Sequence, residues 1–125
     1  MLCNLISLTW DATCSDTLAP SYLPLTAKAA GAAAHSAELR KHSKYTKLPN
    51  SYTLCPFAVE TLGPFGEEAI SLVDELGRRL HLSTGEPRSR SFLIQRLSID
   101  IQRGNTAAVL GTIPISSNFD KIYTI

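Results

Sequence analysis

The sequence is poor in charged residues, and its few cysteines form no familiar pattern. Asp, Glu, Lys and Arg make up 18% of the 125 residues, and the formal net charge is only +1. Such a balance is typical neither of a general polyanion binder nor of an acidic tail. The three cysteines include no Cys-x-x-Cys pair, which argues against a zinc ribbon or a disulfide framework. Free thiols in a reducing compartment are the simpler interpretation, so we expect an intracellular protein of the cytoplasm or nucleus.

Long apolar runs and the common catalytic motifs are also absent. No run approaches the roughly 18 apolar residues that a membrane helix needs. The short apolar stretch from Met1 to Trp10 has neither the basic region nor the cleavage site of a signal peptide. The sequence contains no P-loop, GxGxxG, GxSxG or HExxH motif. We therefore expect no membrane partner, and the function must be sought in less regular patterns.

Hydrophobic residues make up 44% of the chain, which is enough for the core of one domain. The expected elements, in order, are a strand over 5–14, a helix over 21–45, a strand over 52–62, a helix after Gly63-Pro64, and a last helix over 88–110. A right-handed crossover would pair the two strands in parallel. The fold class is therefore α/β, in the order strand-helix-strand-helix-helix, with a small and incomplete sheet. We expect one domain over 1–111 and an irregular tail over 112–125.

Two carboxylates stand near the expected ends of the two strands. Asp11 lies in Trp10-Asp11-Ala12-Thr13, and Glu60 closes the second apolar run. Because parallel strands end at the same edge of a sheet, this pair could share a cation such as Mg²⁺. A turn or helix cap for Asp11, and a solvated strand end for Glu60, are the competing interpretations.

A basic segment follows the alanine-rich helix. Four of the eight residues from Arg40 to Lys47 are Lys or Arg, and a histidine and a tyrosine stand among them. This composition favours contacts to nucleic-acid phosphates, or a lysine that steers a nucleophilic water. Cations at a helix end also complement its dipole, and that interpretation is compatible with the first. The predicted nucleic-acid-binding residues are Arg40, Lys41, Lys44, Tyr45 and Lys47.

The order of short motifs along the chain resembles one protein family. The series is Asp11-Ala-Thr, Arg40-Lys-x-x-Lys-Tyr45, Pro56-Phe-Ala-Val-Glu-Thr-Leu-Gly63, Leu76-Gly-Arg-Arg-Leu80, Gln95-Arg-Leu-Ser98 and Gln102-Arg-Gly-Asn105. It is similar to the restriction-like endonuclease region at the C-terminal end of reverse-transcriptase polyproteins of non-LTR retrotransposons. That domain belongs to the PD-(D/E)XK nuclease superfamily. The resemblance extends from about Trp10 to Gly111.

The resemblance implies an active site of three parts, of which this chain has two. Asp11 matches the second carboxylate of the family, and the segment from Lys41 to Tyr45 matches its helix, with Lys44 as the catalytic lysine. The upstream Pro-Asp carboxylate has no counterpart, because residues 1 to 10 contain no Asp or Glu. We therefore expect a restriction-endonuclease-like core truncated at its N-terminus. Asp11 would be its remaining metal carboxylate, Glu60 could partly replace the missing metal ligand, and Mg²⁺ binding would be weak.

These observations predict a degenerate, retroelement-derived endonuclease-like fragment that is inactive and binds DNA or RNA weakly through its basic helix end. If it were active, it would be a Mg²⁺-dependent DNA endonuclease. The under-paired first strand exposes a sheet edge, so we also expect self-association. Two alternatives stay open. The low charge and the half-sheet favour a non-enzymatic protein interaction module, and the chain could also be a translated relic with no selected role.

Overall fold

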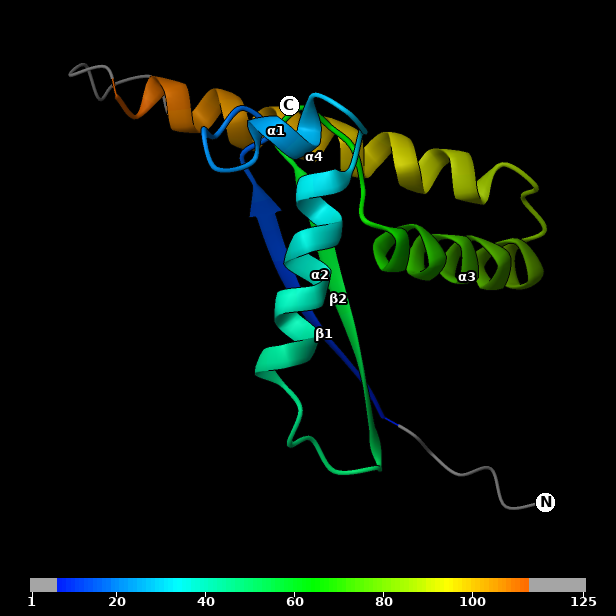
Figure 1. Ribbon diagram of the computed structural model, residues 1–125. Coiled ribbons are helices and arrows are strands. Elements are labelled where there is room, and N and C mark those ends of the chain that lie inside the picture. Colours follow the sequence, from blue (N-terminus) through cyan, green and yellow to red (C-terminus); the bar gives the residue numbers. More distant parts are fainter. Residues whose placement is uncertain (1–6, 113–125) are drawn as a thin grey trace.

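Two parallel strands form the centre of the molecule, and helices flank them (Figure 1). The structure is a computed structural model that describes residues 7–112. Its elements are β1 (Ser7–Ser15), α1 (Leu23–Thr26), α2 (Ala32–Lys44), β2 (Tyr52–Glu60), α3 (Glu67–Thr84) and α4 (Ser89–Leu110). The expected α/β class, the order of the main elements and the parallel pairing are confirmed. Most of the predicted tail, 113–125, lies outside the described residues.

Strand β1 presents two different faces, as alternation along a strand requires. Its odd-numbered side chains point toward α2, where Asp11 meets Lys41. Its even-numbered side chains, among them Leu8 and Trp10, line the opposite face together with α3 and α4. The pairing register runs without a bulge from Ser7 opposite Tyr52 to Ser15 opposite Glu60. Side chains on the two strands therefore share faces pairwise along the whole sheet.

Helix α2 lies close against the sheet because alanines fill the interface. Ala34 and Ala37 of the helix and Ala58 of β2 form a buried cluster, and both Ala34 and Ala58 are fully buried. Small side chains allow the helix axis to approach the strands, so polar groups on α2 can reach the sheet. This close contact positions the candidate site described below.

The single helix predicted over 21–45 was wrong in its first half. A short helix, α1, ends at Thr26, and α2 begins only at Ala32. Between them Gly31 adopts a left-handed conformation with φ of 84°, which glycine tolerates and other residues rarely do. The sequence did not predict this break, because the surrounding alanines favour a helix. Helix propensity alone does not indicate where the chain must turn back toward the sheet.

Helices α3 and α4 form an antiparallel hairpin. Glycine permits the two helices to approach closely, since a Cβ atom added at Gly77 would lie 2.8 Å from the Cα atom of Arg90. The hairpin turns at Gly85, which closes α3 in a left-handed conformation with φ of 76°. The helix predicted after Gly63-Pro64 and the predicted last helix over 88–110 agree with the structure to within a few residues.

Candidate nucleic-acid interface

A carboxylate from the sheet and two polar groups from α2 meet on the α2 side of β1. Asp11 lies in the middle of β1, opposite Pro56, and its side chain points toward the C-terminal end of α2. Lys41 Nζ donates to Asp11 Oδ2 at 2.7 Å. The Tyr45 hydroxyl donates to the same oxygen at 2.9 Å. Residues 30 and 34 positions apart in the sequence are thus brought into direct contact.

The contacts keep Asp11 ionised. Hydrogen bonds from Lys41 and, next, from Tyr45 lower the pKa of the Asp11 carboxyl below its usual value, and the positive charges of Lys41 and Lys44 add to this. About a quarter of each side chain of the ion pair stays exposed, 21% for Lys41 and 27% for Asp11. The pair is therefore open to solvent and to a ligand that competes for the ammonium group.

Lys44 lies beside the Asp11 contact rather than in it. Its ammonium group sits over the ring of Tyr45, 5.1 Å from the centroid, which is a cation–π geometry. The lysine that bonds Asp11 is Lys41, one helical turn earlier. The family resemblance assigned the catalytic role to Lys44, whereas in the structure it is Lys41 that contacts the Asp11 carboxylate. Lys44 is exposed, so its charge is accessible to an anion outside the molecule.

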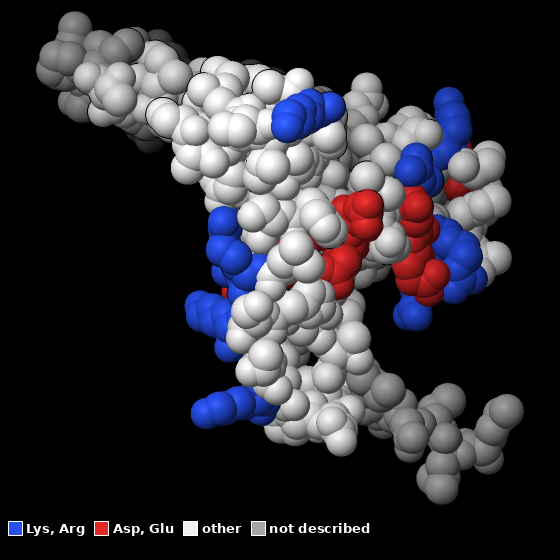
Figure 2. All heavy atoms as spheres, viewed as in Figure 1, with Lys and Arg blue, Asp and Glu red and all other residues white. Residues whose placement is uncertain are grey.

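The remaining predicted binding residues lie on the same stretch of chain. Arg40 donates to the Tyr22 hydroxyl, and its guanidinium lies 5.5 Å from the centroid of that ring. Lys47 is exposed in the turn that follows α2. Figure 2 shows Lys and Arg side chains spaced along the flank that α2 and this following turn form. The basic segment is therefore a row of surface cations with the Asp11 contact among them.

Glu60 does not join this site. The expectation that Asp11 and Glu60 end their strands at matching positions was wrong, because Asp11 pairs with Pro56 in mid-strand and Glu60 pairs with Ser15. The register separates the two positions by four residues, or about 13 Å along the strands. At this separation the two carboxylates do not share a cation.

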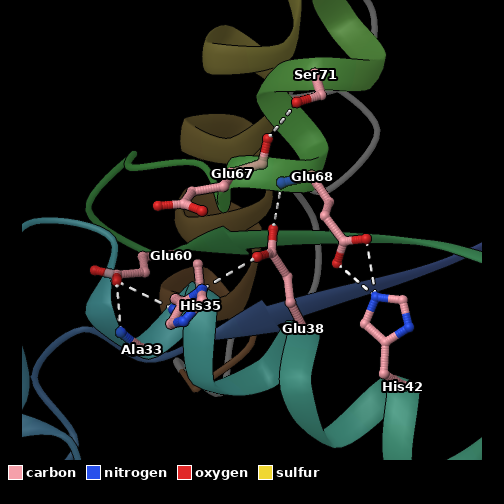
Figure 3. Close-up of polar contacts among 9 residues, drawn as sticks. Ala33, His35, Glu38, His42, Glu60, Glu67, Glu68 and Ser71 are labelled. Atoms are coloured by element: carbon pink, nitrogen blue, oxygen red, sulfur yellow. Dashed lines mark hydrogen bonds and ion pairs between the residues drawn. The ribbon is translucent and has the colours of Figure 1, made fainter.

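The buried carboxylate of Glu60 caps the N-terminus of α2 instead. Its Oε1 accepts hydrogen bonds from the backbone N–H groups of Ala33 at 3.0 Å and Ala34 at 3.2 Å (Figure 3). Its Oε2 accepts from Thr17 Oγ1 at 3.1 Å. The side chain is fully buried, so the solvated strand end considered above was wrong as well. An anion at this place satisfies the unpaired N–H groups of a helix start.

A second buried carboxylate, Glu38, was missed by the sequence analysis. Its Oε1 accepts from the backbone N–H of Glu68 at 2.9 Å, at the start of α3 (Figure 3). A Cβ atom added at Gly66 would lie only 2.0 Å from the same Oε1, so the glycine makes room for this contact. Beside it, His42 bonds Glu68 at 2.8 Å and joins the two helices again. The available signal was that Glu38 is the one acidic residue among the alanines of 27–41.

The residues around Asp11 do not fit the Mg²⁺ site that the resemblance implies. Magnesium is usually held by one or two carboxylates with open coordination positions. Here Asp11 is the carboxylate at the site, and Lys41 and Tyr45 both occupy its Oδ2. Within residues 7–112 no group of three or more His, Cys, Asp or Glu side chains is placed to hold a metal ion.

Comparison with known proteins gives no relative. No protein-family model matches the chain, and neither does any curated protein or any solved structure. Among the described helices, none is long and apolar enough to cross a membrane.

Proposed function

We propose that this protein is a degenerate, retroelement-derived endonuclease-like domain that binds nucleic-acid backbones through the end of α2 and no longer cuts them. The observation that supports it is the contact of Asp11 with Lys41 and Tyr45. The resemblance to restriction-like endonucleases implies that a strand carboxylate and a Lys-x-x-Lys-Tyr helix segment act together. In this proposal Asp11 is the remnant of a metal carboxylate, and Lys44 is the lysine beside the phosphate. In this proposal the protein acts in the cytoplasm or nucleus.

Phosphate binding would rest on the exposed cations and on competition for Lys41. Lys44, Lys47 and Arg40 are exposed and lie on one stretch of chain. Lys41 is held by Asp11, so a phosphate must displace the carboxylate before it gains that ammonium group. Removing the Asp11 charge should therefore strengthen binding of nucleic acid. A carboxylate beside phosphates also repels them, most strongly at low ionic strength.

Binding without cutting follows from the lone carboxylate. Hydrolysis of a phosphodiester in this class needs a metal ion to acidify the attacking water and to polarise the phosphate. We expect no nicking of supercoiled plasmid in Mg²⁺ or Mn²⁺ above the level of Asp11→Ala and Lys44→Ala. Metal-dependent nicking by the wild type that both variants lose would overturn this part of the proposal.

A binding titration tests the proposal with a matched control. Fluorescence anisotropy of a labelled oligonucleotide would be measured for wild type, Lys41→Ala/Lys44→Ala and Arg78→Ala/Arg79→Ala. Both double variants lose two positive charges, but Arg78 and Arg79 lie on α3 and pair with Glu75. We expect the lysine pair to weaken binding about tenfold or more and the arginine pair to change it little. Equal weakening of oligonucleotide binding by the two double variants would mean that binding depends only on net charge.

The second candidate function is a protein interaction module that self-associates through the edge of its sheet. The observation that favours it is the apolar face of β1, where Leu8 is 52% exposed and Trp10 is 65% exposed. Large apolar side chains at this exposure on an edge strand are typical of an association surface. Light scattering that shows a concentration-dependent mass, together with no binding of oligonucleotide, would favour this function over the first.

A further inference from the structure

The two edges of the sheet differ: the β2 edge is partly covered, and the β1 edge is open. The segment after β2 covers the C-terminal end of the outer edge of that strand, where Gly66 N–H donates to Ala58 O at 2.7 Å and Glu60 N–H donates to Pro64 O at 2.8 Å. Within residues 7–112, the backbone of β1 from Leu8 to Cys14 bonds to no element other than β2. An added strand can therefore pair with β1 along its length, whereas the end of β2 is covered.

The exposed face beside this edge has large side chains at one end and small ones at the other. Leu8 and Trp10 occupy the first half of β1, and Ala12 and Cys14 occupy the second half on the same face. A mainly apolar cavity of about 530 Å³ lies beside Ala12 and Cys14. Its other wall includes Leu97 of α4. A cavity therefore lies beside the small side chains at one end of β1, and large exposed side chains stand at the other end.

We propose that a second copy of this chain adds its β1 to this edge in antiparallel fashion, with Asp11 on the twofold axis. Trp10 of one copy then lies opposite Ala12 of the other, and Leu8 lies opposite Cys14. Each large side chain meets a small one and enters the cavity under α4 of the partner. The proposal rests on the second candidate function, the interaction module, and not on nucleic-acid binding.

The register follows from the length and the pattern of the strand. Centring on Asp11 pairs all nine residues of β1 with the nine of the other copy. A slip by one residue would place the apolar side chains of one copy on the same side of the sheet as α2 of the other copy. A slip that centres on Trp10 would oppose the two tryptophans and would place Leu8, instead of Trp10, opposite Ala12. Only the central register pairs every large side chain with a small one.

Charge on the α2 side of the sheet also fits a second copy. The two Asp11 carboxylates would meet at the axis, and like charges directly opposite each other on paired strands are unfavourable. Each one carries its own Lys41 at 2.7 Å, and Lys44 lies close by. Two carboxylates would thus be surrounded by four ammonium groups, which converts the repulsion into a mixed-sign contact. A partner strand without such cations would lack this compensation.

The single tryptophan makes the first measurement direct. Trp10 is the only tryptophan of the chain, so its emission reports on the interface alone. Raising the concentration should shift the emission to shorter wavelength while light scattering changes from one 13.6 kDa chain to two. Trp10→Lys should remain monomeric with an unchanged circular dichroism spectrum, because that side chain is 65% exposed in the monomer. A constant monomeric mass up to about millimolar concentration would overturn the proposal and the interaction module together.

Disulfide trapping tests the register separately. In a background with Cys3→Ser and Cys55→Ser, the variant Leu8→Cys places a thiol opposite Cys14 of the partner. Diamide would oxidise the two thiols to a disulfide and itself be reduced to the hydrazine, which gives covalent dimers. The control Ser7→Cys points to the other face, so we expect little cross-linking. A dimer in which both variants cross-link equally, or in which Trp10→Cys cross-links faster than Leu8→Cys, would overturn the register and leave the interaction module standing.

Discussion

The carboxylate of Asp11 accepts hydrogen bonds from Lys41 and Tyr45, and both lower its pKa. A carboxyl group whose pKa is lower in the folded state stabilises the fold above its unfolded-state pKa, and that contribution is lost as the pH falls through the folded-state value. We expect the stability of the wild type to decline below about pH 4 more steeply than that of Asp11→Asn. Urea unfolding at a series of pH values for both proteins measures the difference. Parallel curves would contradict the assigned contact.

Glu60 contributes to stability through the cap of α2. Glu60→Gln removes the charge that faces the helix start and weakens the bonds to Ala33 and Ala34, so we expect a loss of about 1–3 kcal/mol in unfolding free energy. Glu67→Gln is the matched control, because Glu67 is exposed in the first turn of α3. Its effect should lie within about 0.5 kcal/mol. Similar effects of the two substitutions would rule out the capping role.

For single residues, the sequence indicated which side chains could belong to a site better than it indicated which residues they contact. The basic segment from Arg40 to Lys47 and the acidic Asp11 were singled out from composition, and their meeting was implied only by the family resemblance. The burial of Glu38 and Glu60 could not be predicted. A helix start presents no signal in the sequence for a carboxylate that arrives from a distant strand or helix, because such a cap depends on tertiary packing.

At the scale of elements, the close approach of α3 and α4 depends on Gly77. Gly77→Ala would raise helix propensity, but the new Cβ would lie 2.8 Å from the backbone of Arg90 and force the helices apart. We expect a net loss of about 1–3 kcal/mol. Gly104→Ala in α4 is the control, since a Cβ there has no neighbour within 4 Å, and it should stabilise by about 0.5–1 kcal/mol. Thermal or urea unfolding of both variants would give the comparison, and equal shifts would contradict it.

The elements themselves were largely predictable, and their exact positions were not. Apolar runs with β-branched residues indicated both strands, and helical spacing with glycines at the ends indicated α3 and α4. The break at Gly31 was missed because alanines favour a helix on both sides of it. Asp11 was assigned to the end of the strand although the predicted strand reached residue 14; β1 runs from Ser7 to Ser15, so Asp11 is its central residue.

At the scale of the whole molecule, the core is small. The buried hydrophobic residues in the described part of the chain are five alanines and two valines. A core of this size gives modest stability, so burial of Trp10 and Leu8 in a dimer should add to it. We expect the melting temperature to rise with protein concentration for the wild type and to stay constant for Trp10→Lys. A melting temperature independent of concentration in both proteins would contradict the dimer.

The salt dependence of oligonucleotide binding tests the central claim most directly. Each phosphate contact made by a cation contributes about 0.7 to 0.9 to the slope of the logarithm of the binding constant against the logarithm of salt concentration. We predict that Lys41→Ala/Lys44→Ala lowers the magnitude of this slope by one to two contacts, roughly 0.7 to 1.8, while Arg78→Ala/Arg79→Ala leaves it unchanged. An unchanged slope in the lysine variant would contradict nucleic-acid binding by the end of α2.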